Sequence, residues 1–261
     1  MPIFGKNAVM FKIFKQFGEY FFMLRKTFTR PQKMKIFFRR FFDEVEAIGL
    51  DSLAIVAILS VFMGAVILIQ SAYNFSNPLI PAYAEGVATR DSMLLEFSPT
   101  IISLILVGKV GSSIASELGT MRVTEQIDAL EIMGVDPMNY LVLPKIVAGV
   151  FIIPFLIVIS MFLGVYGGYL ASLLTGAISP GRYIYGIQYD FVPYYIFYAL
   201  VKSAVFAFIL TSVSSFHGYH AQGGALEMVK ENETGIFIPL DNAILAAEKI
   251  HAILPTSTRH Q

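Results

Sequence analysis

The chain has 261 residues, of which 56% are hydrophobic and only 15% are charged. A soluble domain carries about 25% charged residues, so this composition argues against an ordinary soluble enzyme. The formal net charge is zero, which argues against a nucleic-acid partner, and the absence of cysteine excludes disulfides, thiolate metal sites and a cysteine nucleophile. With its long apolar runs, the chain is predicted to form one membrane domain.

Four segments are candidates for crossing a bilayer, whose core of about 30 Å requires roughly 20 apolar residues as helix. Three of them meet this requirement: 50–72, 144–175 and 193–216. The fourth, 93–116, is weaker because it contains Glu96, Pro99 and Lys109. We expect an all-α integral membrane protein with about four transmembrane helices, the third of them tilted or bent at Pro154.

The basic residues are distributed unevenly along the chain. Residues 1–47 hold ten of the 19 Lys and Arg, whereas 73–92 and 176–192 hold one each. Because cytoplasmic segments of membrane proteins are enriched in Lys and Arg, we expect the N-terminus, the 115–143 loop and the C-terminus to face the cytoplasm.

Residues 1–47 are predicted to form two amphipathic helices, the second beginning at Pro31. In the first, apolar residues recur at helical spacing: Met10, Phe14, Phe17, Phe21, Leu24 and Phe28. In the second, they also share one side: Met34, Phe37, Phe38, Phe41, Phe42 and Val45. A basic face opposite an aromatic face is typical of helices that lie in the membrane interface. The alternative is a soluble helical hairpin docked on a partner.

The loop between the second and third spans is rich in acids, with Glu117, Glu125, Asp128 and Glu131 close together. A helix is expected over 123–133, ended by Gly134. One interpretation is a solvated linker. The other is a short helix that docks on a cytoplasmic partner with a basic surface, since acids are unfavourable beside anionic headgroups.

Two ionisable residues inside predicted spans are candidates for function, because charges are costly in a bilayer. Lys202 could contact a lipid phosphate or pair with an acid on another helix, and Glu96 could contact lipid or reach water. Gly164 and Gly168 are predicted to be packing positions. Seven tyrosines near the outer span ends are predicted to form an aromatic belt: Tyr73, Tyr83, Tyr183, Tyr185, Tyr189, Tyr194 and Tyr195.

The string from Gly108 to Leu130, with Met133-Gly-Val-Asp-Pro137 and Leu143-Pro-Lys145 after it, resembles the signature of MlaE-type permeases. Glu96-Phe-Ser-Pro99 and Lys202-Ser203 with Phe206 resemble further elements of that family. These permeases are the membrane subunits of bacterial ABC transporters that move phospholipid between the two membranes of the envelope. The resemblance covers residues 44–226.

The resemblance implies a homodimer in the bacterial inner membrane, with lipid in a cavity between the two copies. It also implies a separate ATPase subunit, which would hold ATP and Mg, and MCE-domain subunits on the periplasmic side. The loop would be the ATPase-coupling element, shaped by Glu117, Gly119, Thr120, Thr124, Glu125 and Asp128. No catalytic residue, metal or cofactor is expected on this chain, which has no P-loop motif.

The expected organisation has interfacial helices in 1–47, a permease domain in 48–227 and a divergent polar tail in 228–261. The family pattern has a fifth span, but the tail is interrupted by charges that are costly at mid-bilayer. A shortened variant, an altered coding end and a very polar fifth span all remain open. The alternative functions are a membrane scaffold that recruits a cytoplasmic complex and a lipid-modifying enzyme, for which no His/Asp/Ser set is visible.

Overall fold

The structure, a computed structural model, describes residues 3–28, 34–75, 79–81 and 83–221, and every regular element in these ranges is a helix. Four helical stretches are long and apolar enough to cross a membrane: Met34–Asn74, Ala84–Val123, Met138–Thr175 and Tyr194–Tyr219. The prediction of an all-α membrane protein with about four spans is therefore confirmed. The expectations for the tail, 228–261, fall outside the described residues.

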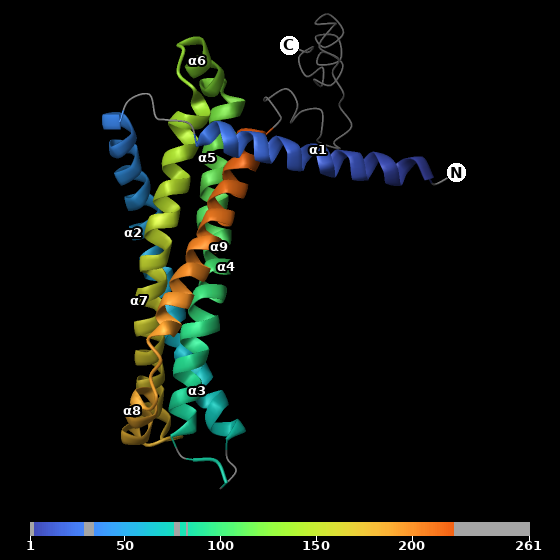
Figure 1. The fold of residues 1–261 in the computed structure, drawn as a ribbon. Helices are drawn as coiled ribbons and strands as arrows, with labels where there is room; N and C mark the ends of the chain where they lie inside the picture. The colour runs from blue at the N-terminus through green and yellow to red at the C-terminus, as the bar shows by residue number, and fades with distance from the viewer. Residues whose placement is uncertain (1–2, 29–33, 76–78, 82, 222–261) are drawn as a thin grey trace, which may run out of the picture. The chain divides into compact units, whose positions relative to one another are not determined.

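The long helices run side by side, and α1 (Ile3–Thr27) crosses them at one end (Figure 1). The short helix α6 (Gln126–Ile132) lies at this end, which we call the α6 end. The helix α8 (Pro180–Gln188) and the start of α3 (Ala84–Ser92) lie at the opposite end, the α8 end. The last helix, α9 (Tyr194–Tyr219), returns the chain to the α6 end.

The sequence predicts a separate amphipathic helix before the first span, and the structure differs from this prediction. Instead α2 is one helix, Met34–Asn74, which includes the segment predicted to lie in the interface. No proline or glycine interrupts residues 34–48, and Phe41 packs against Phe151 of α7 with ring centroids 5.8 Å apart. This packing draws the second amphipathic segment into the bundle, and the expected boundary at residue 47 falls inside α2.

Close packing of α2 against α7 (Leu143–Thr175) depends on glycine. A Cβ atom added to Gly64 would lie 1.7 Å from the carbonyl oxygen of Gly164, and one added to Gly167 would lie 2.1 Å from that of Val61. Only residues without a Cβ allow backbones to approach this closely. Gly168 is equally enclosed, by the Tyr183 hydroxyl. Gly164 and Gly168 are therefore packing positions, as predicted, and α7 continues as helix through Pro154.

The second span is a continuous helical stretch whose hydrogen-bond pattern changes along its length. After α3 it consists of four segments: η1 (Met93–Ile102), α4 (Ser103–Leu106), η2 (Val107–Gly111) and α5 (Ser112–Val123). The segments η1 and η2 are π-helical. Pro99 lies inside η1 and has no N–H to donate to the carbonyl of Leu95 four residues before it. This proline therefore gives a local reason for the departure from α-helical bonding.

One tyrosine predicted for the aromatic belt is instead a core residue. Tyr183 is fully buried, and its hydroxyl donates a hydrogen bond to the carbonyl oxygen of Val165 at 2.9 Å. Burial also raises the pKa of this hydroxyl above its ordinary value. Tyr73, Tyr185 and Tyr194 are exposed, in keeping with the predicted belt.

Candidate functional site: the α5–α6 element and its supports

The protruding element at the α6 end is built from α5, a tight turn and α6 (Figure 1). The expected single helix over 123–133 is interrupted, because Glu125 adopts a left-handed backbone with φ of 59°. The N–H of Gly134, at φ of 76°, donates to Glu131, and the N–H of Val135 donates to Leu130. This pair of bonds ends α6 in the way that a glycine after a helix favours, as predicted.

Four of the six predicted coupling residues gather at this turn. The Thr124 hydroxyl donates to the carbonyl oxygen of Thr120 at 2.7 Å, and Asp128 forms an ion pair with Arg122 across the turn. Glu125 is exposed between them. The turn is therefore fixed by side-chain bonds on both sides, although its central residue is not a glycine.

The other two predicted residues lie further down α5. Gly119 faces the end of α9, where an added Cβ would lie 3.6 Å from the Cβ of Ala221. Glu117 forms an ion pair with Lys145 at 2.7 Å. The structure therefore separates the six predicted residues into a turn group and two positions that pack or pair against other helices.

Lys145 connects three helices at the base of this element. Its side chain is 1% exposed, and its Nζ lies 2.5 Å from Glu44 of α2 and 2.7 Å from Glu117 of α5. A buried ammonium requires such partners, because desolvation without them is very costly. From the sequence, Lys145 is only part of a motif, and this cluster is not predicted.

The tip of the element carries two exposed apolar residues that the sequence did not predict as part of the site. Ile132 is 87% exposed and Met133 is 68% exposed, although Ile127 on the same helix is fully buried. Two large apolar side chains on a protruding turn are typical of an interaction site. The one sequence feature that could have indicated their exposure is their position immediately before Gly134, outside the apolar spans.

The two ionisable residues predicted inside the spans are paired with each other. Lys202 of α9 lies 2.9 Å from Glu96 of η1, and its Nζ also donates to the carbonyl oxygen of Leu95 at 3.0 Å. In an α-helix this carbonyl would accept a hydrogen bond from the N–H of residue 99, which proline lacks. The sequence allowed Lys202 either to contact a lipid phosphate or to pair with an acid on another helix. The structure shows the pair with an acid.

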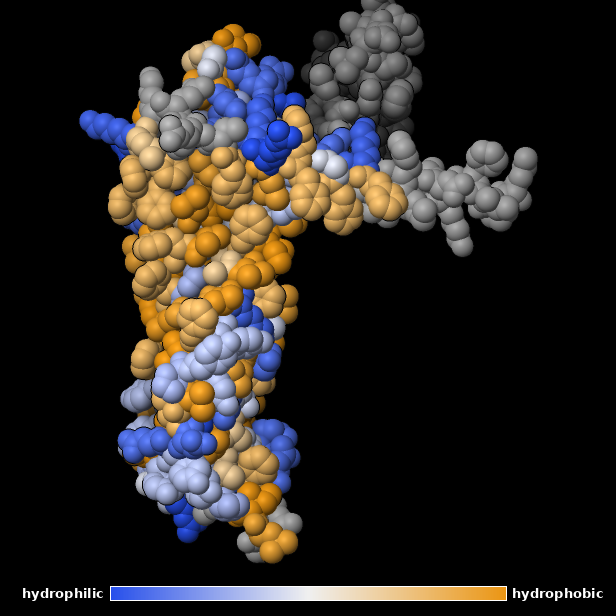
Figure 2. Space-filling model, viewed as in Figure 1, coloured by the Kyte–Doolittle hydropathy of each residue, from blue (hydrophilic) through white to orange (hydrophobic). Residues whose placement is uncertain are grey.

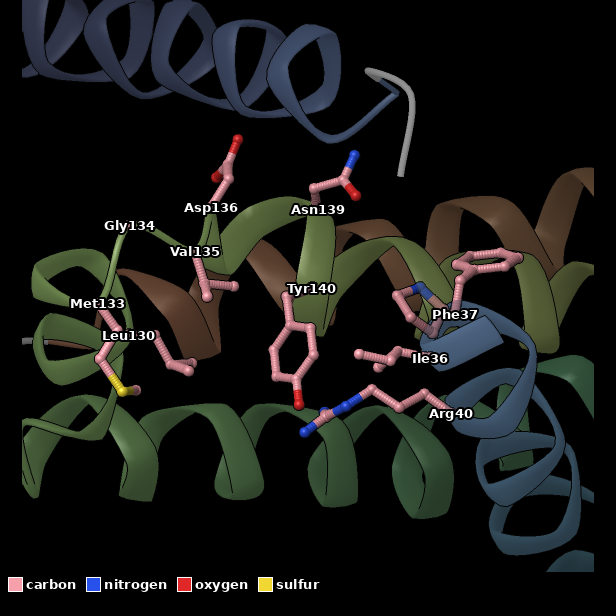
Figure 3. Close-up of a pocket in the computed structure, with 11 residues that line it drawn as sticks. Ile36, Phe37, Arg40, Leu130, Met133, Gly134, Val135, Asp136, Asn139 and Tyr140 are labelled. Carbon is pink, nitrogen blue, oxygen red and sulfur yellow. The ribbon is translucent and has the colours of Figure 1, made fainter. Parts of the chain in front are cut away.

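A cavity of about 430 Å³ opens beside the α5–α6 element. Arg40 enters it from α2, and Tyr140 enters it from η3 (Met138–Val142), as Figure 3 shows. The carbon of the Arg40 guanidinium lies 3.9 Å from the centre of the Tyr140 ring. We refer to this space as the Arg40 cavity.

Four apolar helical spans and a structured, exposed loop element between two of them define a multi-pass membrane protein. The chain belongs to the MlaE permease family, because the family model described as Permease MlaE matches residues 41–239. The resemblance noted over 44–226 is thereby confirmed, and the match extends into the segment expected to depart from the family pattern. Membership assigns the chain to transport proteins rather than to enzymes.

Similar proteins are distributed widely. A probable ABC transporter permease protein of Rickettsia bellii is 33% identical over 85% of this chain and 84% of its own length. The intermembrane phospholipid transport system permease protein MlaE of Haemophilus influenzae is 29% identical, over 82% of each chain. A chloroplastic Arabidopsis thaliana protein named TRIGALACTOSYLDIACYLGLYCEROL 1 is 30% identical over 83% of this chain and 62% of its own. The chain is thus an ABC transporter permease.

Proposed function

We propose that this permease moves phospholipid between the inner and outer membranes of a bacterium. A separate ATPase subunit, which holds ATP and Mg, would dock on the 117–137 loop and drive the movement. Family membership and the name of the Haemophilus influenzae relative support the substrate. In this proposal the chain is a multi-pass inner-membrane protein with a cytoplasmic N-terminus, so that the α6 end faces the ATPase. A second copy and a periplasmic MCE-domain subunit complete the assembly.

The observation that carries the docking proposal is the exposed tip, Ile132 and Met133. Binding energy at protein interfaces concentrates in a few apolar anchors that become buried within a polar rim. Here the rim is acidic, with Glu125 and Glu131 both exposed. A partner groove with an apolar floor and basic edges would complement this tip.

Docking at the tip could be transmitted to the spans through the contacts at its base. The Arg122–Asp128 pair holds α6 to the end of α5, and Glu117 holds α5 to Lys145 of α7. ATP binding and hydrolysis on the partner would shift the permease between two arrangements only if contacts at this element differ between them. In the same proposal, Glu96 and Lys202 contact the transported lipid from the membrane-embedded part.

The test is co-purification of the tagged full-length chain from its native membrane, followed by mass spectrometry of bound proteins and lipids. The test variant is Ile132→Glu, and the matched control is Leu174→Glu, because Leu174 is 85% exposed at the opposite end of α7. We expect the unchanged chain and the control to retain an ATPase and phospholipid. Ile132→Glu should lose the ATPase while retaining phospholipid.

Two outcomes would contradict the proposal. Recovery of the ATPase with Ile132→Glu would place the docking site elsewhere. Recovery of an ATPase without ATP-dependent transfer of phospholipid between donor and acceptor vesicles would favour the scaffold alternative. The second measurement uses the purified complex in vesicles and a non-hydrolysable ATP analogue as its control.

A further inference from the structure

The Arg40 cavity combines an apolar wall with two charged residues, Arg40 and Asp136, and of these two only Asp136 forms an ion pair with a residue that the structure describes. Asp136 is compensated by α1, because Lys26 lies 3.7 Å from its Oδ1, and the same atom accepts a hydrogen bond from the Met138 N–H at 3.2 Å. The wall is formed by apolar residues of α2, α6 and the following turn: Ile36, Phe37, Leu130, Met133 and Val135.

Arg40 is half-buried, and the Glu44 carboxylate attracts its charge only from a distance, without forming an ion pair with it. Among the residues that the structure describes, no carboxylate lies within 4 Å of its guanidinium, since Glu44, one turn further along α2, is paired with Lys145. The guanidinium contacts the Tyr140 ring through a cation–π interaction rather than through a hydrogen bond. Its N–H donors lie in the plane, where they match the oxygens of a phosphate. The cavity is therefore suited to a phosphate group attached to an apolar body.

The position of the cavity indicates where such a ligand comes from. Phe17 and Phe21 of α1 are exposed, and Figure 2 shows hydrophobic side chains on the side of α1 that faces along the bundle. Hydrophilic side chains lie on the opposite side of the coloured part of this helix (Figure 2). Such a helix marks the level of lipid headgroups. The first turns of α2 lie at the same end of the bundle as α1 (Figure 1).

The surface of α2 beside the cavity has the same interfacial character. Met34 and Phe38 are exposed apolar residues, and they alternate with the exposed basic residues Lys35 and Arg39. Basic residues near a membrane surface favour anionic lipids. Apolar and basic groups together therefore favour a lipid over a soluble phosphate compound as the occupant of the cavity.

We propose that the Arg40 cavity binds the headgroup of an anionic phospholipid from the leaflet at the α6 end. Arg40 would hold the phosphate through paired hydrogen bonds, and the apolar wall would cover the glycerol backbone. Because the wall comes from both α2 and the end of α6, the lipid would bridge the first span and the α5–α6 element. This site is separate from Glu96 and Lys202, and it does not depend on the identity of the transported lipid.

The test is a titration of the purified, delipidated full-length chain with phosphatidylglycerol, followed by native mass spectrometry. The test variant is Arg40→Gln, and the matched control is Arg39→Gln, which removes the same charge from the neighbouring exposed position. Losing a bidentate, charge-assisted contact should weaken phosphatidylglycerol binding by about tenfold or more. Arg39→Gln should weaken it by less than about threefold, because exposed charges contribute little. Phosphatidylcholine should bind more weakly than phosphatidylglycerol to the unchanged chain.

A second variant keeps the proposal testable if Arg40→Gln does not fold. Val135→Phe narrows the cavity and keeps every charge, and it should weaken phosphatidylglycerol binding to a similar extent. Equal weakening by Arg39→Gln and Arg40→Gln would overturn the proposal in favour of diffuse attraction. Competition by inorganic phosphate at millimolar concentration would indicate a site for free phosphate. Unchanged phosphatidylglycerol binding, with loss of a co-purifying protein in Arg40→Gln, would indicate a protein-docking pocket.

Discussion

Nζ of Lys145, on α7, lies 2.7 Å from Oε2 of Glu117, on α5. The two ends of this ion pair differ in environment, because Lys145 is 1% exposed and Glu117 is 47% exposed. The second partner of Lys145, Glu44, is 16% exposed. The α5–α6 element is therefore attached to the bundle by one enclosed carboxylate and one carboxylate that a docked protein could reach.

We predict that Lys145→Met lowers the free energy of unfolding by about 3 kcal/mol, because it leaves Glu44 enclosed without its cation. Glu117→Gln should lower the free energy of unfolding by only about 1 kcal/mol, since solvent screens the ion pair between Lys145 and the exposed Glu117. Titration of the protein in mixed micelles with a denaturing detergent measures both changes. Lys145→Arg, which keeps the charge, should recover most of the loss. Equal losses of unfolding free energy in Glu44→Gln and Glu117→Gln would contradict the predicted difference between the two ion pairs of Lys145.

Substitutions at Glu125 can separate the role of the left-handed backbone at the turn from the role of the carboxylate. An L-residue other than glycine loses about 1–2 kcal/mol in the left-handed region, and asparagine tolerates that region better than most. Glu125→Gly and Glu125→Asn should therefore preserve or raise the thermal unfolding midpoint, whereas Glu125→Val should lower it. If ATPase recovery falls in all three variants, the carboxylate is required. If recovery falls only with valine, the turn geometry is what matters.

Adding even one methyl group at the contact between α2 and α7 should destabilise the protein. Gly64→Ala would place a carbon against the backbone of Gly164, so we expect a loss of at least about 2 kcal/mol in unfolding free energy. Gly108→Ala is the control, since a Cβ added there meets nothing within 4 Å. That substitution should be neutral or stabilising by up to about 1 kcal/mol, because alanine favours helix. Unfolding of both variants in mixed micelles provides the comparison.

Tyr183 should make stability depend on pH in the alkaline range. Its folded-state pKa is raised by burial, so the unfolded chain releases this proton first as pH rises. The contribution of Tyr183 is fully present below pH 10 and decreases progressively above it. Tyr183→Phe should lose about 1 kcal/mol at neutral pH with its hydrogen bond to Val165, and show a smaller further decrease between pH 9 and 11. Parallel alkaline slopes for the two proteins, measured by unfolding across this range, would refute the assignment.

Composition and hydropathy were sufficient to predict the four spans, because a bilayer imposes a length of apolar helix that is visible in the chain itself. Hydropathy does not determine the position of Tyr183, because a tyrosine near a span end suits either an interfacial belt or a core. The predicted boundary at residue 47 falls inside α2, since amphipathic and apolar segments differ in pattern even where one helix continues through both.

The α5–α6 element was predicted only in part. Its acids were visible in the sequence, and Gly134 was correctly expected to end the helix. The break at Glu125 was not visible, because a non-glycine residue in the left-handed region is stabilised by surrounding contacts such as the Arg122–Asp128 pair. The exposure of Ile132 also depends on which face of α6 packs inward, and this is a tertiary property.

Pro99 and Lys202 are more than a hundred positions apart, yet they meet at one backbone carbonyl. In an α-helix the amide of residue 99 would bond to the Leu95 carbonyl, but proline has no N–H, and Lys202 donates to the same carbonyl from another helix. Lys202 thus fastens the fourth span to the π-helical stretch of the second span through two oxygens, the Leu95 carbonyl and the Glu96 carboxylate.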